Sequence, residues 1–345
     1  MRTFLKPAAG LVCVIALATA GCSSGTDDSS GSSSTSRPQS SPSPSGSASA
    51  GSSGTAYAPY VSATTASDND SAGSPSTYNL AFVIADGSAC TPSWNGTTAI
   101  GDAAVKSRIS ALTDAGSAVR VSFGGASGKE LASTCDSASE LAAAYGKALD
   151  AAGATEADFD VEGTQLTDSA SVALRSEAIA LLQKEREDLS VTFTLPVMPS
   201  GLDDDSVALL ESANDKGVVV STVNIMTMNY GSSYDEDMGD YAKTSARAAH
   251  DQLEEVFGLS DEGAWKGLAL TSMLGVNDVD NETFSLADAA EVRAFAEEKG
   301  IAWVSMWSTF RDQRCEGDDT DSDDAATNCS GVEQEAGAFA EAFTG

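Results

Sequence analysis

Three carboxylate residues occupy alternate positions in one short stretch of the chain, residues 157–163, whose sequence is ADFDVEG. Alternate side chains of an extended strand share a face, so Asp158, Asp160 and Glu162 point to one side while Phe159 and Val161 point to the other. A row of ionised groups is costly to bury unless its neighbours compensate for the lost hydration. The row is therefore either a solvated edge of a sheet or a functional site.

A carboxyl group beside other carboxylates has a raised pKa, because adjacent like charges resist ionisation, and it can then donate a proton near neutral pH. We expect Glu162 to be the protonated member, with Asp158 and Asp160 sharing the negative charge. Hydrolysis of a glycosidic bond needs such an acid.

Other chemistries find little support in the sequence. The single histidine, His250, lies in a helical run and is typical of a surface or packing residue, so catalytic triads and histidine-based metal sites are disfavoured. The chain has neither a GxxxxGK[ST] phosphate loop nor a GxGxxG fingerprint that opens a helix. We therefore expect carboxylate chemistry without a metal or a cofactor.

The elements that position these carboxylates alternate between β-rich runs and helical runs. Strands are expected at residues 58–61, 78–84, 118–123, 157–161, 190–196, 219–228, 267–274 and 301–307. Helices are expected around residues 105–112, 141–149, 174–182, 203–215, 240–257, 286–299 and 332–343.

Eight such repeats fit the α/β class, as a closed (β/α)8 TIM barrel rather than an open sheet. The weak point is the first helix, because residues 62–76 are polar and irregular. In a barrel, the carboxylate row would lie near the carboxyl end of its strand, where barrel enzymes carry their chemistry. The barrel therefore favours the functional site over the solvated edge.

Residues 1–21 have the pattern of an export signal, with a charged start, an apolar centre and small residues after it. Ala18-Thr19-Ala20 suits ordinary signal cleavage, whereas Ala20-Gly21-Cys22 resembles the end of a bacterial lipobox. We favour lipidation of Cys22, which would place the protein on the extracellular face of a bacterial membrane. The alternative is a secreted protein with a stray thiol.

A flexible linker rich in Ser, Gly and Pro is expected over residues 22–56, because this composition has no apolar periodicity. The catalytic barrel is expected over residues 57–345. Four cysteines fall in it: Cys90, Cys135, Cys315 and Cys329. Of the three possible pairings we expect Cys90 with Cys135 and Cys315 with Cys329, because the latter pair closes a short loop.

The chain is strongly acidic, with 51 acidic residues, 19 basic residues and a formal net charge of -32. Such a charge makes nucleic acid an improbable partner and disfavours anionic polymers. A neutral or cationic substrate is compatible with it.

Four motifs, each at the end of an expected strand, resemble glycoside hydrolase family 18, the chitinases. The stretch DFDVE at residues 158–162 matches the end of the family's DxxDxDxE signature, and SFGG at 122–125 matches SxGG. The run MTMNYG at 226–231 resembles MTMDYG of one bacterial subgroup, and MWS at 306–308 with Arg311-Asp312 resembles WSxxRD. Lesser similarities occur at residues 57–61, 80–86, 195–202 and 275–278. The resemblance covers residues 57–345.

The resemblance implies roles for the acidic row. Glu162 would be the general acid, and the substrate's own 2-acetamido carbonyl would replace an enzyme nucleophile. Asp160 would hold the acetamido N–H, and Asp158 would tune the pKa of Asp160. The SxGG residues Ser122, Gly124 and Gly125 would support the row from the adjacent strand.

Further residues are implied to contact substrate. Met226 and Met228 would line the pocket, Tyr230 would supply a hydroxyl group, and Trp307 would form the floor on which a sugar stacks. Trp94, in a loop after the second strand, is a candidate second platform; a partly buried anchor is the alternative.

Two positions depart from the family pattern. Thr155 stands where the signature begins with Asp, a position far from the sugar. Asn229 replaces the Asp of MTMDYG, and its amide can hydrogen-bond but carries no charge.

The function implied is retaining, substrate-assisted hydrolysis of chitin or N-acetylglucosamine oligosaccharides by a monomer that meets a membrane only through Cys22. One alternative is an endo-β-N-acetylglucosaminidase acting on glycans or cell-wall polymers. The other is a chitin-binding pseudo-enzyme, which Asn229 favours and the complete acidic row opposes.

Overall fold

The computed structural model describes residues 54–315 and 328–345. The expected signal peptide, Cys22 and nearly all of the linker lie outside these residues. None of the helices in the described part of the chain combines the length and apolar character needed to cross a bilayer.

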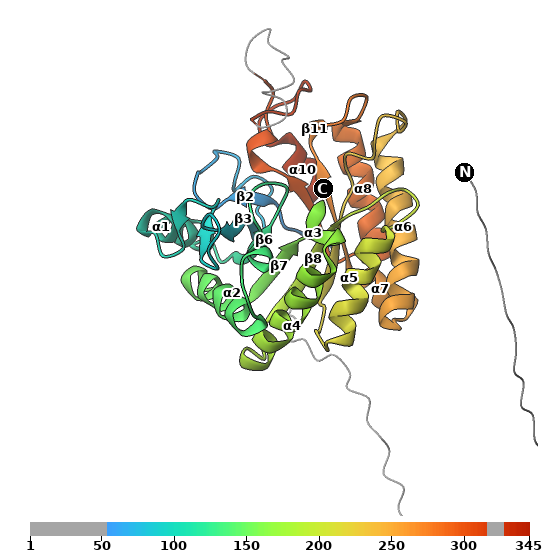
Figure 1. Cartoon of the computed structure of the whole chain (residues 1–345). Coiled ribbons are helices and arrows are strands. Elements are labelled where there is room, and N and C mark those ends of the chain that lie inside the picture. The colour runs from blue at the N-terminus through green and yellow to red at the C-terminus, as the bar shows by residue number, and fades with distance from the viewer. Residues whose placement is uncertain (1–53, 316–327) are drawn as a thin grey trace, which may run out of the picture. The chain divides into compact units, whose positions relative to one another are not determined.

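Parallel strands form a closed barrel with helices around it (Figure 1). The strands are β1 (Ala56–Tyr57) with β2 (Tyr60–Ser62), β3 (Thr77–Ala85), β6 (Ala118–Gly124), β7 (Glu156–Asp160), β8 (Ser190–Pro196), β9 (Thr222–Met226), β10 (Leu268–Met273) and β13 (Trp303–Trp307). Each pairs in parallel with the next, in chain order. The expected α/β barrel is confirmed.

The first barrel strand is split, and both halves are needed to close the sheet. β1 pairs with the last strand, β13, whereas β2 pairs with β3. Pro59 lies between the halves and has no N–H to offer a ladder. Its carbonyl still accepts a hydrogen bond from the Asn79 N–H at 3.0 Å. The proline therefore marks the point where this strand changes partner.

The helices lie on the outside of the barrel (Figure 1). They are α1 (Ala103–Thr113), α2 (Ala138–Ala152), α3 (Thr164–Thr167), α4 (Ser169–Glu185), α5 (Asp204–Asp215), α6 (Met238–Phe257), α7 (Asp261–Lys266), α8 (Leu286–Lys299) and α10 (Ala338–Thr344), with 3-10 turns at Leu131–Ser133 and Thr309–Arg311. Side chains at their N-caps, such as Ser137 and Ser285, accept hydrogen bonds from the first-turn amides.

The last expected helix is shorter in the structure, and the weak point of the barrel expectation has no helix. Residues 332–337 are not helical, and the last helix begins only at Ala338. No helix forms over residues 62–76, where polar residues offer no apolar face to bury. Asp70 instead pins this segment, because it pairs with Arg108 at 2.9 Å and accepts a hydrogen bond from the Thr309 hydroxyl at 2.7 Å.

Short antiparallel strands extend the structure near the carboxyl ends of the barrel strands. β4 (Pro92–Trp94) and β5 (Thr98–Ala99) add to β3, and β11 (Gly275–Val276) pairs with β12 (Thr283–Phe284) after β10. Both expected disulfides are present, Cys90–Cys135 and Cys315–Cys329, with Cα–Cα distances of 4.6 and 5.1 Å.

The apolar face of β7 packs outward against the helices. Phe159 stacks on Phe123 of β6 with ring centroids 5.3 Å apart and contacts Phe193 of β8 at 5.8 Å, and Tyr145 of α2 lies edge-on to it at 5.0 Å. Because Phe159 is fully buried in this aromatic layer, its neighbours Asp158 and Asp160 face the barrel axis. The face predicted from the alternation is confirmed.

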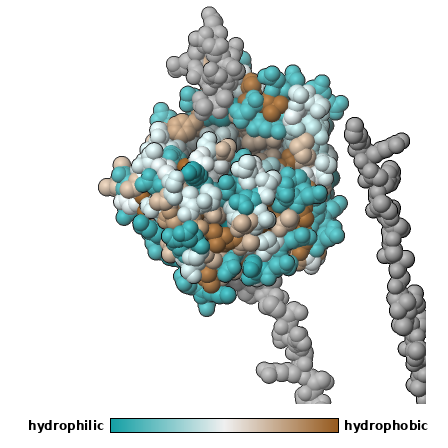
Figure 2. Space-filling view, in the orientation of Figure 1, coloured by the Kyte–Doolittle hydropathy of each residue, from teal (hydrophilic) through white to brown (hydrophobic). Residues whose placement is uncertain are grey.

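The surface is mostly polar. Hydrophilic residues cover most of the face drawn in Figure 2, and hydrophobic ones are scattered between them. Among the described residues the exposed large hydrophobics are Val219 and Leu259. No extended apolar patch is therefore formed by large side chains in the described part of the chain.

Candidate active site

Asp158 lies buried inside the barrel and is held by hydroxyl groups from three other strands. Tyr60 of β2 donates to its Oδ2 at 2.9 Å, Thr194 of β8 donates to its Oδ1 at 2.6 Å, and Ser122 of β6 also donates to Oδ2. Burial raises the pKa of Asp158, while these hydrogen bonds and the charge of Arg120 lower it. Asp158 is therefore a buried carboxyl group with both oxygens satisfied.

The hydrogen bonds continue around the barrel. Asn224 of β9 donates through Nδ2 to the Thr194 hydroxyl at 3.0 Å, and Thr271 of β10 donates to Asn224 Oδ1 at 2.9 Å. All these side chains are buried. The network thus links β2, β6, β7, β8, β9 and β10, and each donor has a defined acceptor. It forms the floor of the site.

Asp160 has a different environment. Only 5% of its surface is exposed, and its Oδ1 has no hydrogen-bond partner among the described residues. Burial, then the nearby carboxylates of Glu162 and Asp158, hold the pKa of Asp160 well above its ordinary value. Burial also raises the pKa of Glu162, which follows β7 at the pocket wall. Asp160 and Glu162 are therefore neighbouring carboxyl groups that both resist ionisation.

Gly124 and Gly125 let two chain segments approach the carboxylate row. Both have positive φ, +98° and +88°. The Gly125 N–H donates to the Asp160 carbonyl at 3.0 Å. A Cβ at Gly124 would lie 2.1 Å from that carbonyl oxygen, and a Cβ at Gly125 would lie 2.9 Å from the Phe82 ring. Glycine is required at 124 by the close approach as well as by φ.

A buried ion pair anchors the segment that follows these glycines. Arg175 of α4 pairs through Nε with Glu130 at 2.9 Å and also bonds it through Nη2, and Tyr145 donates to Glu130 at 3.4 Å. Glu130 is 5% exposed and Arg175 1%. Because breaking such a pair leaves a buried charge unpaired, the pair fixes this segment against α4.

The carboxylates open into a pocket of about 390 Å³ at the carboxyl ends of the barrel strands. Trp307 of β13 and Phe82 of β3 stack with centroids 5.5 Å apart, and Tyr60 lies edge-on to Trp307 at 5.8 Å. Asp160, Glu162, Met226, Met228 and Asn229 also line the pocket, as do Ala126, Thr194, Pro196, Val197, Met198, Asp203, Thr271 and Asp278. The site combines an aromatic surface with carboxyl groups of raised pKa.

The chain is similar in sequence to two proteins that are named as chitinases. It is 34% identical over 275 residues to a probable bifunctional chitinase/lysozyme of Escherichia coli, covering 74% of this chain and 31% of that protein. It is 33% identical over 276 residues to endochitinase 11 of Metarhizium anisopliae, covering 74% of this chain and 52% of that protein. The chain thus spans about a third and about half of these relatives. No protein-family model matches the chain.

Solved structures of chitinases are also similar to the chain. The catalytic domain of a hyperthermophilic chitinase from Pyrococcus furiosus has a TM-score of 0.73 and 28% identity, covering 83% of this chain and 93% of that one. A family GH18 chitinase from Chromobacterium violaceum, at 15% identity and a TM-score of 0.52, shares the fold; the match covers 74% of this chain and 78% of that one. The chain belongs to glycoside hydrolase family 18.

Within this family 18 barrel, most residues expected at the site come together. Asp160, Glu162, Met226, Met228, Asn229 and Trp307 line one pocket. Asp158 and Ser122 lie directly beneath it and are joined by a hydrogen bond. Gly124 and Gly125 lie beside Asp160.

Two expected substrate contacts are wrong. Trp94 is fully buried because it belongs to β4, and its indole N–H donates to the Ile100 carbonyl at 3.3 Å. Tyr230 is turned away from the pocket lining, and its hydroxyl accepts a hydrogen bond from Ser245 of α6 at 3.3 Å. Neither side chain can be a sugar platform or a pocket hydroxyl in this arrangement.

Sequence reasoning missed several residues of the site. Tyr60, Thr194 and Asn224 form the floor, Phe82 extends the aromatic surface, and Asp278 lines the pocket. Residues 57–61, 80–86 and 275–278 resemble the family, which was a usable signal for Tyr60, Phe82 and Asp278. Nothing local marks Asn224, because its role comes from the strand register.

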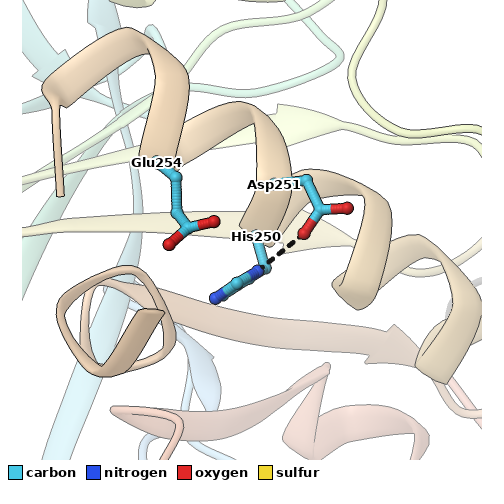
Figure 3. A group of neighbouring side chains, drawn as sticks. All are labelled: His250, Asp251 and Glu254. Atoms are coloured by element: carbon cyan, nitrogen blue, oxygen red, sulfur yellow. Dashed lines mark hydrogen bonds and ion pairs between the residues drawn. The ribbon is translucent and has the colours of Figure 1, made fainter. Parts of the chain in front are cut away.

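His250 has a packing role. It lies on α6 beside Asp251 and Glu254 (Figure 3). Its ring stacks on Trp265 with centroids 4.1 Å apart, its Nδ1 bonds Asp251 at 2.9 Å, and its Nε2 bonds the Asp261 carbonyl at 3.2 Å. Both ring nitrogens are engaged within α6 and α7, which agrees with the expectation of a packing residue.

Gly124→Ala tests the close approach of the SxGG segment to Asp160. We expect a loss of about 3 kcal/mol or more in the free energy of unfolding, because the methyl group adds overpacking to backbone strain. Gly116→Ala is the matched control, since Gly116 has a similar φ of +92° but open space around its Cβ position. It should cost only about 1 kcal/mol. Equal losses in urea unfolding would contradict a steric requirement at Gly124.

Asp160→Asn should stabilise the protein at neutral pH. A carboxyl group whose folded-state pKa is raised makes its largest contribution at low pH and loses it as pH rises toward the folded pKa. The amide cannot ionise, so we expect a gain on the order of 1 kcal/mol at pH 8 that shrinks toward pH 4. Urea unfolding at both pH values measures it, with the exposed Asp188→Asn as control. A gain independent of pH would refute the explanation.

Proposed function

We propose that the protein hydrolyses β-1,4-linked N-acetylglucosamine polymers, chitin and its oligosaccharides, by a retaining, substrate-assisted mechanism. The observation that carries the proposal is the pair Asp160 and Glu162, both with raised pKa, at the wall of an aromatic pocket. A related Pyrococcus furiosus chitinase domain, at 28% identity and a TM-score of 0.73, has been solved in complex with chito-oligosaccharides.

In the first step Glu162 transfers its proton to the glycosidic oxygen, and the bond between this oxygen and the anomeric carbon breaks. The acetamido carbonyl oxygen of the same sugar forms a bond to the anomeric carbon from the opposite face. The products of the step are an oxazolinium cation, a free sugar hydroxyl on the leaving chain and an ionised Glu162.

In the second step the carboxylate of Glu162 accepts a proton from water while the water oxygen bonds to the anomeric carbon. The bond from the carbonyl oxygen breaks and restores the acetamido group. Two inversions give net retention at the anomeric carbon. Glu162 ends protonated, so the cycle is balanced.

Asp160 would orient the acetamido group and stabilise the cation. Its Oδ1 has no partner among the described residues and can accept the acetamido N–H. This hydrogen bond favours the ionised carboxylate, and a negative charge beside the oxazolinium cation lowers the barrier to its formation. Asp158 supports this by its charge and is itself held by Tyr60, Thr194 and Ser122.

The aromatic surface suits a pyranose ring. Sugars present apolar C–H faces, and the stacked rings of Trp307 and Phe82 offer a matching flat surface in the pocket. With Trp94 and Tyr230 removed from the site, these two rings and Tyr60 are the aromatic contacts available in the pocket lining.

The alternative functions differ in substrate or in turnover. An endo-β-N-acetylglucosaminidase acting on glycans or cell-wall polymers would use the same carboxylates, and one relative is named a probable bifunctional chitinase/lysozyme. A chitin-binding pseudo-enzyme was suggested by Asn229. The complete acidic row opposes the second alternative, because Asp160 and Glu162 keep the raised pKa values that catalysis needs.

Glu162→Gln should lower the hydrolysis of an acetylated chitin hexasaccharide by at least about a thousandfold, because the amide can neither donate nor accept the required proton. Product analysis by mass spectrometry measures it. Turnover similar to the wild type would refute the role of Glu162.

Fully deacetylated chitosan is the control substrate for the same assay. It has no acetamido carbonyl at the cleavage point, so the wild-type enzyme should leave it intact. Cleavage of a peptidoglycan or glycan panel in preference to chitin would favour the glycosidase alternative. Binding of chitin without product release would favour the pseudo-enzyme.

Export and anchoring form a separate part of the proposal. The two disulfides are compatible with an oxidising, extracytoplasmic location. We propose that Cys22 is lipidated and tethers a monomeric catalytic barrel outside the membrane through the linker at residues 22–56. Cys22→Ala should move the protein from the membrane fraction to the medium, as measured by immunoblotting. A wild-type protein found only in the medium would contradict anchoring.

A further inference from the structure

Glu282 is a buried carboxyl group that the proposed reaction does not use. It lies between β11 and β12, is 1% exposed, and is not among the residues that line the pocket. Burial raises the pKa of Glu282, whereas hydrogen bonds from the backbone N–H groups of Gly231, Tyr230 and Asn229 lower it. A buried carboxyl group is costly unless such donors compensate for its lost hydration. The position of Glu282 therefore depends on the turn at residues 229–231.

The turn at residues 229–231 follows β9 and bends around the Glu282 carboxyl group. Asn229 has a left-handed backbone, with φ of +55°, and Gly231 has φ of +116°. The Gly231 N–H donates to Glu282 Oε1 at 2.7 Å, and the N–H groups of the two preceding residues face the same carboxyl group. Successive N–H groups that turn to one side make a concave site for an anionic oxygen. Glu282 fills this site, so the left-handed turn has a partner that is distant in sequence.

A second contact joins the same turn to the same hairpin, and this one lies at the pocket. Asn229 donates through Nδ2 to Asp278 Oδ2 at 3.1 Å, and the Asp278 N–H donates to Asn229 Oδ1 at 3.0 Å. Both residues line the pocket, and we call this part of its lining the Asn229–Asp278 wall. The two bonds form only while the turn directs Asn229 toward the hairpin. The shape of the wall therefore depends on the turn that Glu282 holds.

The hairpin that carries Glu282 is fixed to the rest of the barrel. Arg311 is fully buried, and its Nη2 donates to the carbonyl oxygens of Leu274 and Val276 at 2.6 and 2.5 Å. The Val276 N–H in turn donates to the Ser330 carbonyl at 2.8 Å. Because the hairpin is anchored in this way, Glu282 offers the turn a fixed point of attachment.

We infer that Glu282 is a positioning residue for substrate binding, which holds the turn at residues 229–231 and thereby sets the Asn229–Asp278 wall of the pocket. This inference rests on the proposed function, because the pocket is taken to bind the oligosaccharide that is cleaved. Glu282 does not line the pocket, so it acts on the substrate through Asn229. Its effect belongs to substrate affinity, while proton transfer by Glu162 depends on the end of another strand, β7.

Three substitutions at Glu282 separate its oxygen from its charge. Glu282→Ala removes the acceptor of the turn. Glu282→Gln keeps an oxygen for the Gly231 N–H without the charge, and Glu282→Asp keeps the charge but draws the carboxyl group back by one methylene. The matched control is Asp288→Ala, which removes another buried carboxyl group that binds a backbone N–H. Asp288 is 6% exposed, accepts a hydrogen bond from the Ser285 N–H at 2.6 Å and does not line the pocket.

The kinetic constants of these variants are measured on an acetylated chitin hexasaccharide. We expect Glu282→Ala to raise KM about five- to tenfold at nearly constant kcat, because a loosened wall weakens binding of substrate and transition state alike. Glu282→Asp should raise KM in the same direction, and Glu282→Gln should keep it within about twofold of the wild type. Asp288→Ala should lower the midpoint of urea unfolding and leave KM at the wild-type value.

Two further measurements test the route of the effect. In the Asn229→Ala background, Glu282→Ala should raise KM no further, because residues that act through one contact are not additive. In the Glu162→Gln background, calorimetry with the same hexasaccharide should show Kd changing by the factors seen in KM. Effects of Glu282→Ala and Asn229→Ala that add in full would overturn the inference.

The outcomes separate the inference from the proposed function. A wild-type KM in Glu282→Ala, with the hexasaccharide still cleaved, would overturn the inference alone, and so would an equal rise of KM in Asp288→Ala. If Glu282→Ala does not fold, the contrast between Glu282→Asp and Glu282→Gln decides, and equal KM values in these two would overturn the inference. If even the wild type cleaves nothing, the proposed function fails, and the Kd values in the Glu162→Gln background still decide whether Glu282 sets the wall.

Discussion

The burial of a carboxyl group inside a closed barrel is the constraint on which the site depends. Asp158 loses its hydration there, and the loss is offset because Tyr60, Thr194 and Ser122 donate hydrogen bonds to it. These donors come from three strands, so they meet Asp158 only when the strand register is correct. The hydrogen-bond network of the floor therefore forms only when the barrel closes, because the split first strand supplies Tyr60.

The fully hydrogen-bonded floor contrasts with Asp160, which lies above it and lacks a partner for one oxygen in the described part of the chain. Asp160 lies two residues further along the same strand, buried and with one oxygen unpartnered among the described residues, so burial and its carboxylate neighbours raise its pKa. The two aspartates are similarly buried. Both oxygens of Asp158 accept hydrogen bonds, whereas Asp160 Oδ1 accepts none from the described residues. This difference leaves Asp160 with an oxygen that a ligand's N–H group can satisfy, an arrangement that costs stability in the free protein.

Local pattern predicted much of this arrangement. The alternation in DFDVE predicted the face of each side chain, and the succession of strands and helices predicted the barrel. The motifs predicted six of the pocket residues, Asp160, Glu162, Met226, Met228, Asn229 and Trp307. Trp94 and Tyr230 were misplaced because exposure depends on elements packed over them: β4 encloses Trp94, and Ser245 of α6 turns Tyr230 away. The hydrogen bonds to Asp158 were also missed, since Tyr60 and Thr194 come from strands distant in sequence.

Asn229 shows why a departure from a family motif has to be interpreted with its partner. As a lone substitution it removes a charge from the pocket, which favours a weakened enzyme. Beside Asp278 it is the donor of a hydrogen bond that an ionised aspartate could not make. The pocket therefore keeps a carboxyl group at this wall, that of Asp278, and the Asn229 amide holds it in place. The amide that removes a charge at position 229 thus also orients Asp278.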